Sequence, residues 1–185
     1  MSFTESNMLP LGTPAPWFEL PDTVSGNVLS LDQLQSDVAT VIMFLCNHCP
    51  YVKHVNPEIV RLSKEYQAKG AAFIGISSND IIKYPEDAPE KMKKVAEQEG
   101  YSFPYLFDET QAVAKAYDAA CTPDFYIFDG DLQLAYRGRL DASRPGNDMP
   151  LDGRDLRAAL DLVLAGRAPG EKQYPSGGCN IKWKN

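Results

Sequence analysis

Two cysteines separated by two residues, Cys46 and Cys49, form the part of the sequence best suited to chemistry. They stand between an apolar run, 38–45, and a segment with helical periodicity that begins at Pro50. At such a strand-to-helix junction, backbone N–H groups and the helix dipole favour an anion, so a thiolate there is more acidic than a free cysteine. A span of this length also lets two sulfurs form a reversible disulfide. The pair therefore predicts a redox centre.

In disulfide exchange one thiolate attacks a partner disulfide and a second thiol resolves the mixed disulfide. Cys46 comes first after the strand and should be the more exposed, so we expect Cys46 to attack and Cys49 to resolve. Pro50, however, disfavours the helical conformation at Cys49, which would make Cys49 the helix N-cap and stabilise a thiolate there as well. His48 is either a cation or donor that lowers the pKa of a neighbouring thiolate, or an exposed residue without that role; we favour the first.

Three further positions are candidates for redox chemistry or substrate binding. Thr122-Pro123 precedes an expected strand, and a cis proline there would expose the backbone of Thr122 for pairing with an extended substrate, although a trans turn is commoner. Cys121 is either a buried core residue or an additional redox thiol. Cys179 lies in a Gly-rich tail and could swing to the pair as a further resolving thiol, but an inert tail residue is favoured because termini are often loose.

A half zinc site is the structural alternative for the cysteine pair. Zinc would need two more ligands, and the chain offers only Cys121, Cys179 and two histidines at irregular spacing. We therefore favour redox chemistry over metal binding, and expect no metal and no organic cofactor.

The composition is that of a soluble globular protein, with 44% hydrophobic and 23% charged residues among 185. We expect a single domain, 1–185, with a core at about 8–166 and a C-terminal tail at 167–185. The net charge of −7 disfavours nucleic acid and anionic membranes as partners. Residues 1–20 hold no Lys or Arg and no long apolar run, so we expect no signal peptide and a cytoplasmic protein, in which cysteines are seldom structural disulfides.

The elements that must position the pair are a strand buried on both faces, 38–45, and a helix that ends near Gly70, with a kink or restart at Pro57. The order β-α-β, then α, a β-hairpin and a last α predicts a mixed sheet covered by helices on both faces. The other expected elements are a hairpin at 18–20 and 28–31, a short helix at 30–35, strands at 71–77 and 103–107, helices around 92–96 and at 109–117, a hairpin at 125–128 and 132–137, an exposed loop at 141–153, and a helix at 156–166.

The run Cys46-Asn47-His48-Cys49-Pro50, with Thr122-Pro123 far downstream, resembles the thioredoxin superfamily. The N-terminal hairpin and the insertion before Phe103 are similar to its peroxiredoxin-like and thioredoxin-like thiol–disulfide oxidoreductase branch. The resemblance covers about residues 8–166 and implies an α/β, thioredoxin-like fold with a mixed central sheet, helices on both faces and an N-terminal β-hairpin extension. It also implies that Pro123 is the cis-proline packed against the pair, with Cys121 nearby.

The sequence departs from two patterns of that superfamily. Thioredoxin has Gly-Pro between its cysteines and Trp before them, where this chain has Asn47-His48 and Leu45. Peroxiredoxins use the pattern Pro-x-x-x-Thr/Ser-x-x-Cys. When Cys49 is aligned with the cysteine of this pattern, Ile42 stands at the proline position and Cys46 at the Thr/Ser position. Efficient peroxidase activity is therefore not expected, although slow peroxide reduction by a low-pKa thiol is compatible with the sequence.

The leading hypothesis is a thiol–disulfide oxidoreductase with antioxidant chemistry at Cys46 and Cys49. Its substrate would be a protein or small-molecule thiol or disulfide, and a separate reductant such as a thioredoxin-type or glutathione system would recycle it. The alternatives are a thiol peroxidase acting through Cys49, and a metal-binding module that uses Cys46, Cys49 and a histidine, as in the copper-handling branch of the superfamily.

Overall fold

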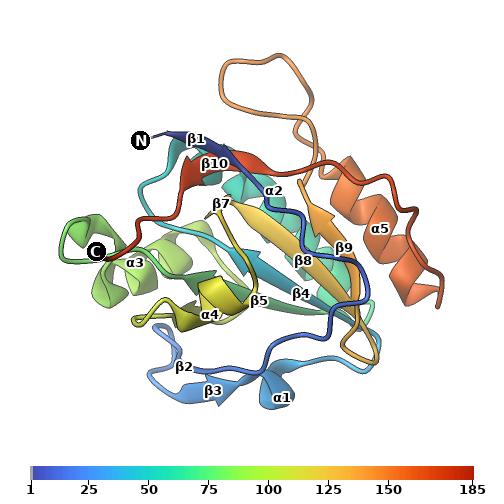
Figure 1. Ribbon diagram of the computed structural model, residues 1–185, viewed down its shortest axis with the longest axis horizontal. Coiled ribbons are helices and arrows are strands. Elements are labelled where there is room, and N and C mark those ends of the chain that lie inside the picture. The colour runs from blue at the N-terminus through green and yellow to red at the C-terminus, as the bar shows by residue number, and fades with distance from the viewer. Residues whose placement is uncertain (1) are drawn as a thin grey trace.

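The centre of the computed structural model, which describes residues 2–185, is a five-stranded mixed sheet with strand order β6-β5-β4-β8-β9 (Figure 1). Strands β4, β5 and β6 are parallel to one another, β8 runs antiparallel to β4, and β9 runs antiparallel to β8. All six residues of β4 are buried, because β4 lies in the middle of the sheet and both faces are covered. The strands are β4 (Ala39–Phe44), β5 (Ala72–Ser77), β6 (Tyr105–Phe107), β8 (Asp124–Asp129) and β9 (Leu134–Gly138).

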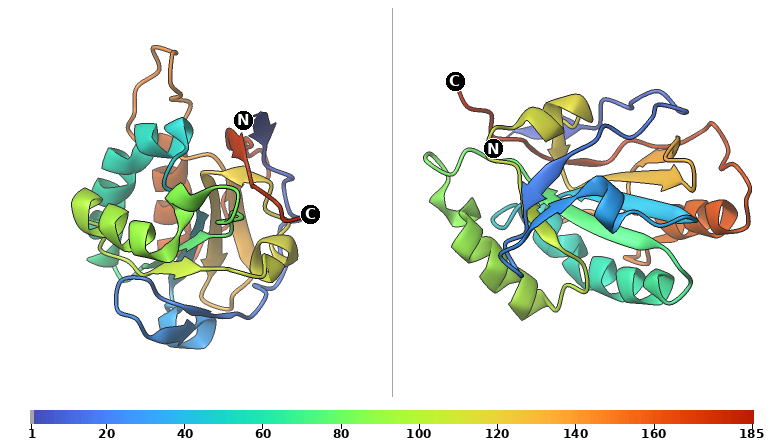
Figure 2. Two further views of the ribbon diagram at one scale, coloured as in Figure 1. Left: turned by 90° about the vertical axis from the view of Figure 1, so that its left-hand side faces the viewer. Right: turned by 90° about the horizontal axis from the view of Figure 1, so that it is seen from below.

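Alternate side chains of β4 enter two separate cores. Val41 and Met43 belong to the core that contains the inward residues of α2 (Pro50–Gln67), α3 (Pro89–Glu99) and α5 (Arg154–Leu164). Ile42 and Phe44 enter the opposite core, beneath the hairpin of β2 (Glu19–Pro21) and β3 (Val28–Ser30), the short α1 (Leu31–Leu34) and α4 (Ala112–Ala116). Helices therefore cover both faces, as predicted (Figure 2). None of the helices in the described part of the chain has the length and apolar character needed to cross a bilayer.

Local sequence signals account well for the N-terminal part of the fold. The predicted hairpin is present as β2 and β3, which pair in antiparallel register. Ser30 caps α1 with a capping box in which the side chain of Gln33 accepts the N–H of Ser30. The restart predicted at Pro57 is not found, because α2 runs without interruption from Pro50 to Gln67. Pro57 lies on the exposed side of the helix, where a displaced backbone carbonyl can be hydrated.

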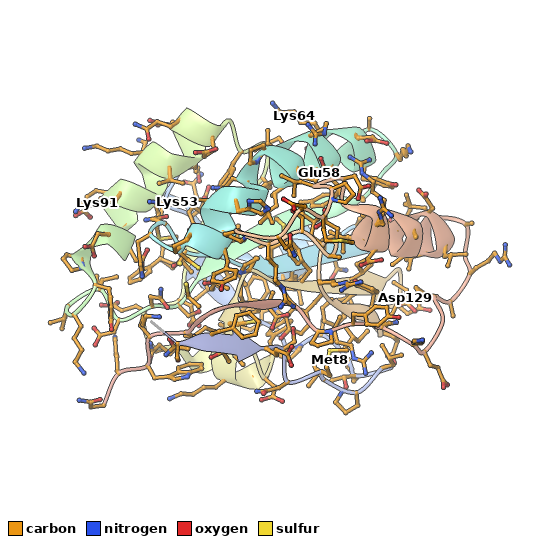
Figure 3. The ribbon with its side chains drawn as sticks, turned by 90° about the horizontal axis from the view of Figure 1, so that it is seen from above. Met8, Lys53, Glu58, Lys64, Lys91 and Asp129 are labelled. Atoms are coloured by element: carbon orange, nitrogen blue, oxygen red, sulfur yellow. The ribbon has the colours of Figure 1, made fainter. Side chains whose placement is uncertain are left out.

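The last residues of the chain do not form a loose tail, contrary to our expectation for Cys179. The segment β10 (Gly177–Asn180) lies between β1 (Phe3–Glu5) and β7 (Cys121–Thr122) in a three-stranded antiparallel sheet (Figures 1 and 3). No sequence pattern predicted this sheet, because its three strands are two to four residues long and come from distant parts of the chain.

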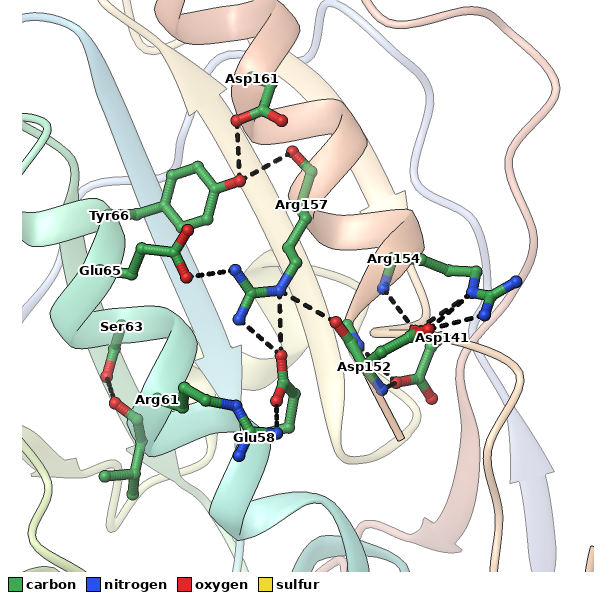
Figure 4. A network of polar contacts seen from close by, with 12 residues as sticks. Glu58, Arg61, Ser63, Glu65, Tyr66, Asp141, Asp152, Arg154, Arg157 and Asp161 are labelled. Carbon is green, nitrogen blue, oxygen red and sulfur yellow. Dashed lines mark hydrogen bonds and ion pairs between the residues drawn. The ribbon is translucent and has the colours of Figure 1, made fainter. Parts of the chain in front are cut away.

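An ion-pair network joins α2 to α5 (Figure 4). Glu58 is fully buried and accepts hydrogen bonds from the guanidinium of Arg157 at 2.7 and 3.0 Å. Arg61 pairs with the second oxygen of the same carboxylate, and Arg157 also pairs with the exposed Glu65. A buried carboxylate needs such partners, so this network fixes the helix that carries the cysteine pair against the last helix.

Replacing Glu58 by Gln should destabilise the protein by ~1–3 kcal/mol, because two guanidinium groups lose their buried anionic partner. The matched control is Glu65→Gln, which removes a more exposed partner of the same Arg157 and should cost less than about 1 kcal/mol. Urea unfolding of both variants measures the difference, and equal losses would contradict the importance of burial at Glu58.

Candidate active site

The two cysteines of the pair occupy the junction between β4 and α2. Cys49 is the N-cap of α2, with an extended backbone, and Pro50 is the first helical residue, as the proline predicted. Cys46 lies between the end of β4 and the helix. Both side chains are buried, with relative exposures of 1% for Cys46 and 0% for Cys49. The greater exposure on which we based the choice of Cys46 as the attacking thiol is therefore not found.

Several donors converge on the sulfur of Cys49. The thiol of Cys46 is the largest contributor, followed by the thiol of Cys179 and the backbone N–H groups of Val52 and Cys179. Burial opposes ionisation, yet these contacts together lower the pKa of Cys49 to about 5. The first turn of α2 adds its dipole to this stabilisation. Cys49 therefore carries the thiolate in this arrangement.

Cys46 has the opposite environment. The hydrogen bond that its thiol gives to Cys49 raises the pKa of Cys46 well above the ordinary cysteine value, and burial and the negative charge of Asp87 act in the same direction. Its sulfur also lies 3.4 Å from the hydroxyl oxygen of Thr122. The pKa values of the two thiols are thus shifted in opposite directions, and Cys49 is the more acidic of the pair.

His48 is paired with a carboxylate. Its Nδ1 atom lies 2.6 Å from an oxygen of Asp87, and its ring stacks on Tyr84 with centroids 5.6 Å apart. The contact with Asp87 raises the pKa of His48, although partial burial opposes the charged form. A negative charge on Cys49 also raises the pKa of His48, but more weakly than Asp87 does. The main partner of His48 is thus Asp87, and not a thiolate as the sequence suggested.

Asp87 is a site residue that sequence reasoning missed. It is fully buried in the short 3-10 helix η1 (Pro85–Asp87) and accepts the N–H of Asn47 at 2.8 Å and the amide of Asn79 at 2.9 Å. Burial opposes its ionisation, but these donors and His48 together lower the pKa of Asp87. Asp87 lies between the strand expected at 71–77 and the helix expected around 92–96, and no spacing in the sequence connects it to the cysteines.

The loop before β8 lies against the pair. The Thr122-Pro123 peptide bond is cis, as the resemblance implied, and the Thr122 carbonyl oxygen lies 3.5 Å from the sulfur of Cys49. The backbone of β7, which we expected to be open to an extended substrate, is paired with β10 instead. Cys121 is buried, its sulfur lies 3.8 Å from the Pro123 carbonyl oxygen, and burial raises the pKa of its thiol.

One group of side chains in residues 2–185 has the geometry to hold a metal ion. It consists of Cys46, His48 and Asp87, whose ligand atoms lie within 4.8 Å of one another. Sulfur, nitrogen and oxygen donors of this kind suit a transition metal. The group differs from the expected set because Asp87 takes the place of Cys49. The other histidine, His54, contacts the hydroxyl of Ser143 at 2.7 Å.

The mixed sheet, the cysteine pair at a helix N-terminus and the cis-proline loop define a thioredoxin-like protein. The chain belongs to the AhpC/TSA family, whose model matches residues 11–137. Family membership and the thiol pair together support a thiol-based redox enzyme. A search of curated proteins found no match.

Solved structures agree with this assignment of fold. An uncharacterized conserved protein from Geobacillus kaustophilus is 63% identical, with a TM-score of 0.98 over 100% of this chain and 97% of its own. A hypothetical protein from Sinorhizobium meliloti 1021 is 44% identical, with a TM-score of 0.95 over 98% of each chain. Peroxidoxin BcpB from Mycobacterium tuberculosis is 23% identical, with a TM-score of 0.63 over 85% of this chain and 98% of its own, and shares the fold.

The thiolate at Cys49 should be visible in a pH titration of the fully reduced protein. The ultraviolet absorbance of thiolate is expected to disappear with a midpoint near pH 5, because protonation of Cys49 removes the charge that its donors stabilise. Cys49→Ser should lose this transition and Cys121→Ser should keep it. A transition only in the range of ordinary cysteines would contradict the assignment.

Replacing Asp87 by Asn should lower the pKa of His48 towards the ordinary histidine value and should also lower the pKa of Cys46, because both are raised by the same carboxylate. NMR titration of the imidazole protons measures the first effect. The imidazole signals of His54, which contacts Ser143, serve as an internal reference. An unchanged His48 titration would contradict the pairing with Asp87.

Proposed function

We propose that the protein is a thiol–disulfide oxidoreductase in which Cys46 and Cys49 alternate between a dithiol and a disulfide. The observation that carries this proposal is the buried thiol pair at the start of α2, where Cys49 is the N-cap. The pKa values of the two thiols are shifted in opposite directions, down at Cys49 and up at Cys46. The cis-proline loop beside the pair supports it further.

The exchange proceeds in two substitutions at sulfur. The Cys49 thiolate attacks one sulfur of a partner disulfide, a new S–S bond forms, and the other partner sulfur leaves as a thiolate. Cys46 then gives up its proton and attacks the sulfur of Cys49, which releases the second partner thiolate. Two electrons pass from the pair to the partner. These roles reverse the order that we expected from the sequence, because the donors gather at Cys49.

The environment of Cys49 also bears on the direction of the reaction. Stabilising a thiolate favours the reduced pair and makes the Cys46–Cys49 disulfide a stronger oxidant. Each tenfold shift of the exchange equilibrium corresponds to roughly 30 mV for the two electrons. We propose protein or small-molecule thiols and disulfides as substrates in the cytoplasm, and a separate thioredoxin-type or glutathione system as the reductant.

The test is peptide mapping by mass spectrometry, without reduction, of fully reduced protein treated with one equivalent of hydrogen peroxide. The expected main product is the Cys46–Cys49 disulfide. Cys46→Ser cannot form this disulfide, and Cys49→Ser should lose exchange activity with a small disulfide altogether. Cys121→Ser is the matched control and should behave as the wild-type protein. Absence of the Cys46–Cys49 disulfide would overturn the proposal.

A thiol peroxidase acting through Cys49 is the second candidate, favoured by the pKa of about 5. Its product in the same experiment is sulfenic or sulfinic acid at Cys49. In peroxiredoxins a proline and a threonine or serine orient the peroxide. Ile42 and Cys46 stand at these two places here, so neither the proline ring nor the hydroxyl is present.

A metal-binding module is the third candidate, favoured by the proximity of Cys46, His48 and Asp87. Stoichiometric metal in protein purified without chelator would support it. Metal-free protein with full redox cycling would exclude it.

A further inference from the structure

The C-terminal strand β10 occupies the edge of β7, next to the cysteine pair. Cys179 is paired with Thr122, the residue before the cis proline, and Asn180 is paired with Cys121. An extended polypeptide can bind an open strand edge through main-chain hydrogen bonds. At this site the chain's own last strand makes those bonds.

The contact between β10 and β7 is closely fitted at Gly178. A Cβ atom at this position would lie 2.0 Å from the carbonyl oxygen of Thr122, so only glycine allows the backbones to approach this far. The other edge of β10 is covered by β1, where Phe3 is paired with Cys179. The ring of Phe3 in turn contacts Tyr51 in the first turn of α2, with centroids 5.8 Å apart.

The pairing brings a third thiol to the redox pair. Cys179 is buried, with 3% exposure. Hydrogen bonds from its thiol and its backbone N–H both lower the pKa of Cys49. A cysteine that lies on an extended strand, paired with the cis-proline loop and in contact with the thiolate, stands where the reacting cysteine of a bound polypeptide would stand.

We propose that β10 is an internal substrate strand: Cys179 exchanges with Cys49 to form a Cys49–Cys179 disulfide, and β10 must leave β7 before an extended polypeptide can bind there. This inference rests on the proposed function and deepens it, because it identifies what competes with the substrate and adds a third redox thiol.

The reaction balances with a small disulfide as oxidant. The Cys49 thiolate attacks one sulfur of the small disulfide and expels a thiolate. The Cys179 thiol then loses its proton and attacks the Cys49 sulfur, which expels the second thiolate. Cys49 and Cys179 lose two electrons in total, and the small disulfide is reduced to two thiols.

The charges around the two alternative partners of Cys49 differ. Asp87 disfavours a thiolate at Cys46, whereas Lys182 favours one at Cys179. Burial is the main reason that the pKa of Cys179 is raised to about 12, and contact with the charged Cys49 adds to it. Once Cys49 has entered a mixed disulfide its charge is gone, so this part of the barrier to ionising Cys179 disappears.

The experiment uses full-length Cys46→Ser protein, reduced and then treated with one equivalent of 5,5′-dithiobis(2-nitrobenzoate). Two equivalents of coloured thiolate are expected per protein, with a Cys49–Cys179 disulfide in the peptide map. Cys46→Ser combined with Cys179→Ser should release one equivalent and retain the aromatic adduct on Cys49. Cys46→Ser combined with Cys121→Ser is the matched control and should release two. A stable adduct in Cys46→Ser itself would overturn the inference.

A second variant tests the strand without changing either Cys49 or Cys179. Gly178→Ala, made in the Cys46→Ser background, should push β10 from β7, remove most of the Cys49–Cys179 disulfide and speed the alkylation of Cys49. Gly170→Ala is the control, since a Cβ there meets no atom within 4 Å. Equal disulfide yield and equal alkylation in the two variants would overturn the role of β10.

The outcomes separate this inference from the proposed function. If the wild-type protein forms the Cys46–Cys49 disulfide and Cys46→Ser keeps its adduct, the inference about β10 is refuted and the proposed function stands. If Cys46→Ser forms the Cys49–Cys179 disulfide but the wild-type protein never links Cys46 to Cys49, the proposed dithiol function is refuted and the inference stands.

Discussion

A buried negative charge on the sulfur of Cys49 is the constraint on which the rest of the site depends. Charge in the interior of a protein is costly unless donors surround it, and one helix N-terminus supplies only part of that compensation. Here the remaining donors come from Cys46 on one side and from Cys179 on the other. The two ends of the site are therefore more than 130 residues apart in the sequence, from Cys46 to Cys179, and the thiolate needs both.

A second buried charge adds to the difference between the two cysteines. Asp87 is held ionised by Asn47, Asn79 and His48, and its field opposes a negative charge on nearby Cys46. His48 compensates this carboxylate, so its effect on the pair is largely indirect. An intervening histidine in such a motif thus need not act as a cation beside the thiolate. It can instead allow a carboxylate to be buried, and the carboxylate then contributes to the asymmetry of the pair by raising the pKa of Cys46.

The parts of the fold that the sequence predicted are those determined by neighbouring residues. The apolar run of β4, the periodicity of α2, the turn between β8 and β9, and Pro50 after Cys49 are all local signals, and each is confirmed. Asp87 and β10 were missed because their roles come from tertiary contacts. The loop around Asp87 has no periodicity, and the run Gly177-Gly178-Cys179 is typical of a flexible segment until the Thr122 carbonyl is known to lie against Gly178.

The C-terminal strand β10 lies outside the part of the chain that matches the family model. The AhpC/TSA model ends at Arg137, so α5 and β10 lie outside the part of the chain that matches it. The similarity to the two solved relatives that are 63% and 44% identical covers 100% and 98% of this chain, and so extends beyond the residues that match the family model. The matched part supplies the cysteine pair, Asp87 and the cis-proline loop. The segment beyond it closes the edge of β7 and brings Cys179 to the sulfur of Cys49. A site built in this way has its acidity and its access controlled by the same strand, because displacing β10 to admit a substrate also removes donors from Cys49 and makes its thiolate more basic and more nucleophilic.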